Sequence, residues 1–371
     1  MEDYNNYKKI EKVLDGVTIE QYKKTLNCFE DELSKKLYYY EVMMDNNKDN
    51  NPYYGLMLCK TAFENNNFKN YEERISYRLI CFLLKDDNYK KKIYVIGCSA
   101  YGNSLFTIMG QTRKGTNIEE FFDEDINNPY YYGNKSPISE LKNRKFDDNC
   151  CFIVGNPKYE YLLNDLPDNK FFIDYDTTSY DIGFQYFEEG ICPFNDHEVF
   201  VDGGAYNLEN TDQFIKNTNN RFKHVYAFEP NRELYEHDME TINNNNWDRV
   251  TLYNYALFDK EDKITFSNIS FGGSRVDANG TSTCECNSID NLLLDKEVSV
   301  IKMDIEGAES KALKGAEKTI KKNKPKLIIC VYHEPNDVIN LINQVMSIRD
   351  DYKIYLRHYS TCIYETVAYF V

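Results

Sequence analysis

The stretch that decides the fold is VSVIKMDIEGAES, residues Val298 to Ser310. A short apolar run there ends abruptly in Asp304, Ile305, Glu306 and Gly307, and a pattern typical of a helix follows. A buried strand needs neither carboxylate in order to fold. In an open parallel sheet, ligands bind beyond the carboxyl ends of the strands. The stretch therefore predicts a strand, turn and helix of an α/β sheet, with both carboxylates facing a ligand.

Similar apolar runs recur between residue 186 and residue 371. They are EVFVDGG, HVYAFEP, VTLYNYAL, VSVIKMD, KLIICVYHEP, YKIYLRHY and ETVAYFV. Helical patterns separate most of the first five, which favours a parallel sheet with helices on both faces. The last two runs are joined by only a few residues around 360–364. A parallel crossover needs about a dozen residues or more, so we predict a seven-stranded sheet whose last strand is antiparallel.

Two further segments precede this sheet. Residues 1–88 have apolar residues at helical spacing, which predicts a helical segment for packing or for assembly into a homo-oligomer. Residues 91–176 alternate between strand and helix patterns, which predicts a smaller doubly wound α/β domain. Its Gly97 and Gly102 approximate a dinucleotide-binding fingerprint without meeting it. The domain is therefore either a nucleotide or nucleotide-sugar binding unit or a scaffold without a ligand.

Composition limits the partners and the compartment. The formal net charge of −16 argues against a nucleic acid or an anionic membrane as partner. No run of about 18 apolar residues is present, and the N-terminal residues lack the apolar region of a secretory signal. Eleven cysteines without an export signal indicate the reducing cytosol, so we expect a cytoplasmic protein without membrane insertion. Cys284 and Cys286 have no second pair at zinc spacing, and we predict no metal there.

The first two runs end in residues suited to a cofactor. The first ends in Asp202-Gly203-Gly204-Ala205-Tyr206, where a carboxylate suits a cationic group and glycine permits close approach of the backbone. No Gly-Lys-Ser/Thr follows, so a P-loop is excluded. The second run ends at Glu229, which is placed to accept ribose hydroxyls. Together these residues favour an adenosyl ligand with an amino-acid tail.

The later strand ends carry candidates for the reaction. Asp304 and Glu306 are available to a substrate, although carboxylates at a helix start also stabilise the helix dipole. His333 and His358 are two of only five histidines, and each follows or ends a predicted strand. A histidine there can accept a proton from a hydroxyl near neutral pH, although a lone histidine is more often structural. In a metal-dependent variant, Asp304, Glu306 and His333 would bind a hard cation instead.

These segments resemble the FkbM family of methyltransferases. VFVDGGAY, VYAFEPN, LYNYALFD, SID, IKMDIEGAESKALKGA, KPKLIICVYHEP and YLRHYS stand in the order expected for it, over about residues 195–371. The resemblance implies an S-adenosylmethionine-dependent enzyme with the seven-stranded class I fold. Many members methylate hydroxyl oxygens on sugars or natural products. The order of helical segment, small Rossmann-like unit and methyltransferase resembles a bacterial subset of the family.

The resemblance also implies roles for residues that match by position. The cofactor-binding residues it implies are Asp202, Gly203, Gly204, Ala205, Tyr206, Glu229, Asn231 and Asp304. The reaction-site residues are Asp304, Glu306, His333 and His358, with Arg357 nearby, and the segment SFGGSR (270–275) resembles a lid. Where the family commonly has a further glycine, this chain has Leu208. We therefore predict O-methylation of a sugar, glycan or related small molecule; the alternative is a non-catalytic nucleotide- or sugar-binding scaffold.

Overall fold

The computed structural model describes residues 4–46, 52–65, 71–97, 111–112, 118–127, 133–173, 185–188, 190–268, 274–276 and 282–371. The chain divides into two compact units. Unit 1 comprises residues 1–19, 35–183 and 358–365, and unit 2 comprises residues 20–34, 184–357 and 366–371. The boundaries predicted above for three segments stay predictions.

Helices dominate the N-terminal part of the chain, as predicted. They are α1 (Tyr7–Glu11), α2 (Ile19–Leu26), α3 (Glu32–Asp45), α4 (Tyr53–Asn65) and α5 (Ile75–Leu84). In unit 1, α4 and α5 pack against one face of a sheet. Leu56, Phe63 and Leu79 contact Ile93 and Ile153 in one fully buried cluster. The apolar residues that α4 and α5 carry at helical spacing thus bury their side chains in a core shared with the sheet.

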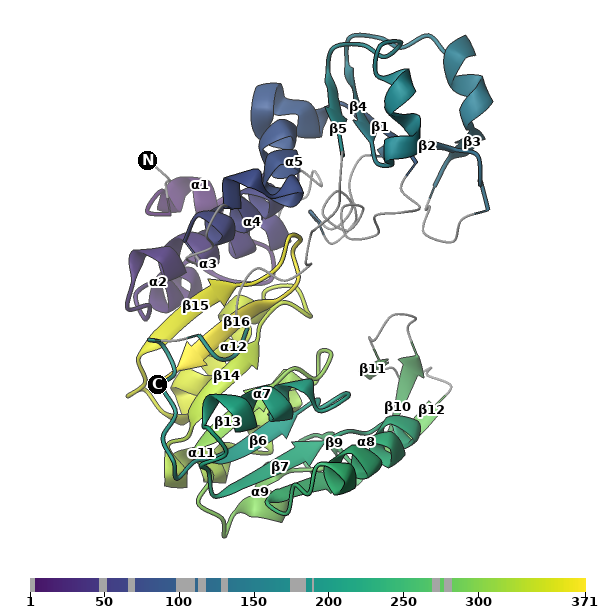
Figure 1. The fold of residues 1–371 in the computed structure, drawn as a ribbon. Helices are drawn as coiled ribbons and strands as arrows, with labels where there is room; N and C mark the ends of the chain where they lie inside the picture. Colours follow the sequence, from purple (N-terminus) through teal and green to yellow (C-terminus); the bar gives the residue numbers. More distant parts are fainter. Residues whose placement is uncertain are drawn as a thin grey trace. The chain divides into compact units, whose positions relative to one another are not determined.

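The sheet of unit 1 is parallel and doubly wound (Figure 1). Its described strands are β1 (Lys92–Ile96), β2 (Ile118–Asp123), β3 (Lys135–Pro137), β4 (Cys150–Val154) and β5 (Lys170–Phe172). They follow the order β3-β2-β1-β4-β5. The alternation of strand and helix patterns predicted for residues 91–176 is thus present, although β3 has only three residues. After β4 the helical element is a 3₁₀ helix (Pro157–Leu162).

The glycine at the end of β1 has a packing role. Gly97 has φ +63, and a Cβ atom there would lie 2.2 Å from the ring of Tyr159. That ring is buried beside the strand ends, and its hydroxyl donates to Asp123 Oδ1 over 2.7 Å. The close approach that glycine permits is therefore used by a side chain of the same unit, which favours the scaffold interpretation of this domain. Gly102, the other half of the approximate fingerprint, lies outside the described residues.

The sheet of unit 2 confirms the predicted seven-stranded fold within the part of the chain described. Its strands are β6 (Val199–Gly203), β7 (His224–Phe228), β8 (Val250–Tyr253), β13 (Val300–Met303), β14 (Lys326–Cys330), β15 (Ile354–His358) and β16 (Thr366–Phe370). The order is β15-β16-β14-β13-β6-β7-β8. The pairs among β14, β13, β6, β7 and β8 are parallel, and β16 is antiparallel to β14. The short connection before the last strand forces this reversal.

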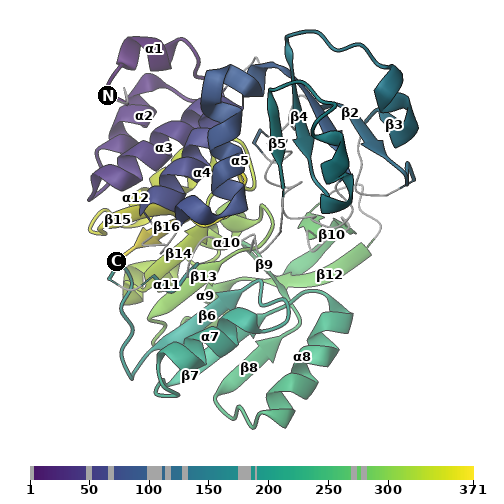
Figure 2. The ribbon, with the colours of Figure 1, turned by 45° about the horizontal axis from the view of Figure 1, so that its top comes forward.

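Helices cover both faces of this sheet. They are α7 (Glu209–Asn217), α8 (Arg232–Asn244), α9 (Ile289–Leu293), α10 (Glu309–Lys314), α11 (Glu317–Asn323) and α12 (Asp337–Ile348). The chain steps from β6 to β7 to β8 in one direction and from β13 to β14 in the other. Because parallel crossovers are right-handed, α7 and α8 cover one face, and α10 and α11 cover the opposite face (Figure 2).

A small four-stranded sheet lies between β8 and β13 in the chain. It has the order β11-β10-β12-β9, with β9 at Ala256–Leu257, β10 at Asp262–Asn268, β11 at Ser274–Val276 and β12 at Ser282–Asn287. The sequence analysis did not predict it, because these short strands alternate with polar loops. The lid prediction for 270–275 falls mostly outside the described residues, since only Ser274 and Arg275 are described there.

Two expectations about the whole chain can be compared with the structure. None of the helices in the described ranges combines the length and the apolar character needed to cross a membrane. None of the described cysteines forms a disulfide, and Cys151 and Cys330 are fully buried in strands, where a thiol acts as a small apolar group. Cys98 lies outside the described residues.

Candidate active site

Most of the predicted site residues lie where the strand order of unit 2 reverses; His358 is the exception described below. The first strand, β6, lies between β13 and β7, and the register pairs Asp202 with Lys302 and Gly203 with Met303. The backbone N–H of Asp304 continues this pairing by donating to the carbonyl oxygen of Gly203 over 3.2 Å. The carboxyl ends of these strands therefore meet at one rim, the position at which open α/β sheets bind ligands.

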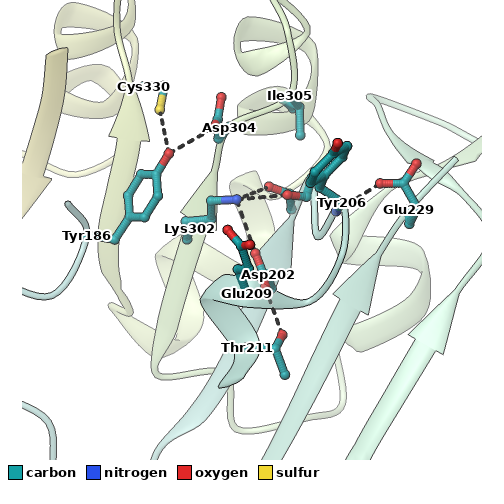
Figure 3. A network of polar contacts seen from close by, with 12 residues as sticks. Tyr186, Asp202, Tyr206, Glu209, Thr211, Glu229, Lys302, Asp304, Ile305 and Cys330 are labelled. Carbon is teal, nitrogen blue, oxygen red and sulfur yellow. Dashed lines mark hydrogen bonds and ion pairs between the residues drawn. The ribbon is translucent and has the colours of Figure 1, made fainter. Parts of the chain in front are cut away.

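A buried ion pair supports the loop that follows β6 (Figure 3). Lys302 Nζ lies 3.2 Å from Asp202 Oδ1, and both side chains are fully buried. The same ammonium donates to the carbonyl oxygens of Gly203 and Gly204 over 3.1 and 2.9 Å. Thr211 Oγ1 donates to the other oxygen of Asp202 over 2.8 Å. Burial lowers the pKa of Lys302, but Asp202 and Asp304 outweigh it and raise the pKa, so the lysine stays charged.

This pairing bears on the predicted role of Asp202. Because its carboxylate is fully buried and faces Lys302 and Thr211, it presents no exposed oxygen to the amino group of a cofactor. We leave Asp202 out of the direct cofactor contacts proposed below. Its position indicates instead that it fixes the ammonium that holds the loop.

The loop after β6 has an unusual backbone. Gly204 has φ +76, and a Cβ there would lie only 1.8 Å from the carbonyl oxygen of Asp304. Tyr206 and Leu208 also have positive φ, at 51° and 63°. A left-handed residue other than glycine costs roughly 1–2 kcal/mol, which explains why the family commonly has glycine at the position of Leu208. Here the leucine keeps the left-handed conformation, and only 1% of it is exposed.

The loop is tied to the end of β7. The N–H groups of Gly204 and Ala205 donate to the carbonyl oxygen of Phe228, and the N–H of Tyr206 donates to Glu229 Oε2 over 3.0 Å. Glu229 Oε1 accepts from the N–H of Asn231 over 2.8 Å. Each carboxylate oxygen has a second lone pair with which to accept a hydroxyl. Glu229 is thus held at the strand end where an acidic residue can bind a ribose.

Burial changes the protonation of this carboxyl. Glu229 is 6% exposed, and burial raises its pKa to about 7 in spite of the two backbone donors.

Asn231, the next predicted cofactor residue, caps a helix. Its side chain accepts from the N–H groups of Glu233 and Leu234 and so caps α8. Its predicted contact with the cofactor stays a prediction.

Asp304 is held at the rim by tyrosine. The hydroxyl of Tyr186 donates to Asp304 Oδ2 over 2.7 Å (Figure 3). The hydroxyl of Tyr332 lies 3.5 Å from Asp304 Oδ1. Burial alone would raise the pKa of Asp304, but Lys302 and His333 outweigh it and lower the pKa. The side chain is still 24% exposed. Asp304 is therefore an ionised carboxylate that a small molecule can reach.

His333 lies among three carboxylates. Its Nε2 is 3.5 Å from Asp304 Oδ1 and 3.7 Å from Glu306 Oε2, and its Nδ1 is 3.1 Å from Glu309 Oε1. Burial lowers the pKa of His333, but the carboxylates, Glu309 first, outweigh it and raise the pKa to about 9. In this arrangement both ring nitrogens of His333 carry a proton at neutral pH, and the imidazole is cationic. It can act as the predicted base only after it has lost one of these protons.

Two other predicted residues have different surroundings. His358 belongs to unit 1, where it is fully buried with Nε2 3.7 Å from Cys59 Sγ, and burial lowers its pKa to about 3. It offers no surface to a substrate, so we do not carry it into the proposed reaction. Arg357 pairs with Asp31 over 2.8 Å and with Glu188 over 3.2 Å. Both partners are in unit 2, and the arrangement suits a structural role.

Three residues of the site were missed by the sequence analysis. Lys302 interrupts an otherwise apolar strand, which is a signal that could have drawn attention to it. Glu309 was not among the predicted site residues, yet it is fully buried, accepts from the N–H of Ile305 and contacts His333. Tyr186 lies in a connection without periodicity, so no sequence pattern pointed to it.

Comparisons with known proteins support a methyltransferase. Residues 202–353 match the family model described as the methyltransferase FkbM domain. A crystal structure of a methyltransferase FkbM from Methylobacillus flagellatus KT is similar in fold, with a TM-score of 0.54 and 18% sequence identity over 85% of this chain and 98% of that chain. No curated protein sequence matches the chain.

Other solved structures are similar over a smaller share of the chain. An rRNA methylase from Streptococcus thermophilus has a TM-score of 0.32 and 14% identity over 48% of this chain and 87% of that chain. A precorrin-6y C5,15-methyltransferase from Geobacter metallireducens GS-15 has a TM-score of 0.30 and 9% identity over 48% and 80%. Residues 202–353 therefore match a methyltransferase FkbM domain, and the fold of the chain is similar to that of a methyltransferase FkbM.

Proposed function

We propose that the chain transfers a methyl group from S-adenosylmethionine to a hydroxyl oxygen of a sugar, glycan or related small molecule. The observation that carries this proposal is the rim at which the loop after β6, Glu229 and Asp304 come together. One end of this rim offers a ribose acceptor, and the other offers partly exposed carboxylates. The proposal keeps the predicted cytoplasmic location of the enzyme.

The loop and Glu229 would hold the cofactor. Gly203 and Gly204 bring backbone close to the strand end, and Lys302 fixes their carbonyl oxygens. The carboxylate of Glu229 would accept the ribose hydroxyls, as acidic residues at the end of a second strand do in dinucleotide-binding folds. The carboxylates of the rim also favour the positive charge of a sulfonium. These features support an adenosyl ligand with a cationic reacting centre.

Asp304 and Glu306 would hold the acceptor. Their side chains are 24% and 40% exposed, so a hydroxyl can reach them. Methyl transfer is an in-line displacement, and the protein contributes mainly by aligning the reacting atoms. As the new oxygen–carbon bond forms and the sulfur–carbon bond breaks, the hydroxyl proton would pass to one of these carboxylates. Tyr186 keeps Asp304 oriented through its 2.7 Å hydrogen bond.

Calorimetry with a matched pair of variants tests the cofactor part of the proposal. Glu229→Gln keeps the size of the side chain but removes the charge that attracts ribose hydroxyls. Glu240→Gln makes the same change on the exposed surface of α8. We expect wild type and Glu240→Gln to bind S-adenosylmethionine alike, and Glu229→Gln to bind at least about tenfold more weakly, since hydrogen bonds to charged groups contribute about 1.5–3 kcal/mol.

The acceptor part needs a separate assay. Transfer of a labelled methyl group to a panel of mono- and oligosaccharides, compared with the same panel lacking the free hydroxyl, distinguishes oxygen methylation from other reactions. Cofactor binding without transfer to any hydroxyl compound would reject the acceptor class. Equal affinity of all three proteins for the cofactor would reject the role of Glu229.

A further inference from the structure

We propose that Asp304, Glu309 and His333 form a binding site for one divalent cation of the Mg²⁺ or Mn²⁺ class. The use of this cation in catalysis rests on the proposed function, but its binding does not. Each of these residues contributes one ligand atom, and these atoms lie within 4.8 Å of one another. Once the imidazole of His333 has lost its extra proton, two carboxylate oxygens and one imidazole nitrogen form a mixed donor set of the kind that Mn²⁺ binds.

The buried carboxylate of Glu309 is the first independent observation. Glu309 is fully buried at the first residue of α10. Its Oε1 accepts from the N–H of Ile305 over 2.9 Å, but its Oε2 is buried without a hydrogen-bond partner among the described residues. Buried acceptors are normally satisfied, and an unsatisfied charged oxygen is especially unfavourable. A cation would satisfy it.

The balance of charge is the second observation. Asp304, Glu306 and Glu309 all approach the single imidazole of His333. Lys302, a cation beside Asp304, has its own carboxylate partner in Asp202. Within the described part of the chain, the carboxylates of Asp304 and Glu309 therefore carry more negative charge than the imidazole of His333 can balance, even when it is protonated. Since burying excess charge is costly unless it is paired, a divalent cation is the ligand that this cluster fits.

The distances to His333 agree with a shared cation. Nδ1 lies 3.1 Å from Glu309 Oε1, so the imidazole and this carboxylate are close enough to bind one ion. Nε2 lies 3.5 Å from Asp304 Oδ1, too far for a good hydrogen bond but suited to two atoms that bind one ion. The partly exposed Asp304 and Glu306 leave a path from solvent.

The position of the site gives the cation a chemical use. Asp304 is also the residue proposed to hold the acceptor hydroxyl. A cation bound there can accept hydroxyl oxygens of a polyol and lower the pKa of one of them, which makes the oxygen a better nucleophile. Vicinal hydroxyl groups, as in sugars, would bind such a cation through two oxygens. The inference thus narrows the acceptor class to compounds with neighbouring hydroxyls.

Mn²⁺ titration of the full chain tests the site without measuring activity. After treatment with a chelator and dialysis, the free Mn²⁺ signal in electron paramagnetic resonance reports how much ion the protein binds. We expect one Mn²⁺ per wild-type chain. Glu309→Gln, His333→Gln and Asp304→Asn should each weaken binding at least tenfold, and Glu240→Gln should not change it. Asp304→Asn is included because its side chain is partly exposed, so that this variant can fold even if the buried ones do not.

The outcomes separate this inference from the proposed function. Absence of Mn²⁺ binding to wild type at millimolar concentration, or equal binding by Asp304→Asn and wild type, would overturn the cation site. S-adenosylmethionine calorimetry on the same metal-free samples reports the cofactor site independently. Mn²⁺ binding without cofactor binding would support the cation site and reject the proposed cofactor. Cofactor binding without Mn²⁺ binding would support the proposed cofactor and reject the cation site.

Discussion

Lys302 and Asp202 are direct neighbours on adjacent parallel strands, and their charged atoms lie 3.2 Å apart in a fully buried environment. The ammonium also binds the carbonyl oxygens of Gly203 and Gly204, so one ion pair holds the strand end and the loop that begins there. This relationship makes the loop a preformed element. It also places the polar residues on both sides of it, Glu229 and Asp304, at fixed positions along one rim.

Breaking this ion pair should destabilise the protein strongly. Removing one partner of a buried pair costs about 3–5 kcal/mol, because the other charge stays buried. We expect the free energy of unfolding of Lys302→Met to fall by this amount. The loss in the double variant Lys302→Met/Asp202→Asn should be smaller than the summed losses of the two single variants, by at least about 0.5 kcal/mol. Urea unfolding of the four proteins measures this, and strictly additive losses would show that the two charges do not act as a pair.

The conformation of Gly204 should be indispensable. In Gly204→Ala a Cβ atom would meet the carbonyl oxygen of Asp304 at 1.8 Å, so either the loop or β13 must shift. Gly190→Ala is a matched control, because Gly190 also has positive φ, at 94°, but nothing lies within 4 Å of its added Cβ. The free energy of unfolding of the control should fall by about 1 kcal/mol from backbone strain alone. That of Gly204→Ala should fall further, and this variant should bind the cofactor poorly. Equal melting temperatures would contradict the close approach.

Glu229 should make stability depend on pH. Its pKa in the folded state is raised to about 7, from an ordinary value of 4.5, so the folded state holds the proton more tightly than the unfolded state. This contribution to stability is fully present below pH 4.5 and is lost as the pH rises through 7. The shift corresponds to about 3 kcal/mol in total.

Comparing wild type with Glu229→Gln isolates this effect. The glutamine cannot ionise, so the stability difference between the two proteins should shift in favour of the variant by about 2–3 kcal/mol between pH 5 and pH 8. Urea unfolding at several pH values provides the measurement. A difference that does not change with pH would mean that the carboxyl titrates normally in the folded state.

Substitutions at the acceptor side should lower turnover while cofactor binding persists. Asp304→Asn and His333→Ala remove groups that contact the reacting side of the rim, and proton-transfer residues typically contribute about 10²–10⁴-fold. Tyr186→Phe removes only the donor to Asp304, so its effect should be smaller. Methyl-transfer rates combined with calorimetry separate the two functions. Unchanged turnover in both Asp304→Asn and His333→Ala would exclude these residues from the reaction.

Most of the fold of unit 2 could be predicted from the sequence. Apolar runs with polar ends located β6, β7, β13 and β14, because buried parallel strands are apolar throughout and their polar residues collect at the carboxyl ends. The few residues at 360–364 were enough to predict the antiparallel last strand. The small sheet containing β10 and β12 was missed, since half-exposed strands between polar loops leave no clear period.

The site was less accessible to sequence reasoning. Residues at strand ends were found, because topology alone brings them together. The partners of Asp202 and His333 were missed, since Lys302 and Glu309 pair with them only through the register of neighbouring strands and the packing of α10. The burial of His358 also depends on packing that no local pattern encodes. The positions of the strand ends in the sequence predicted where the rim lies. They did not show which charged side chains at the rim already have a partner.

The central claim is that this rim binds S-adenosylmethionine through the loop after β6 and Glu229. Titration calorimetry of the full chain with S-adenosylmethionine and its demethylated product tests it most directly. We predict saturable binding of one molecule per chain, which is lost in Gly204→Ala and weakened in Glu229→Gln but kept in Glu240→Gln. Absence of binding at millimolar ligand to the folded wild-type protein, or binding that is identical in all three variants, would contradict the account.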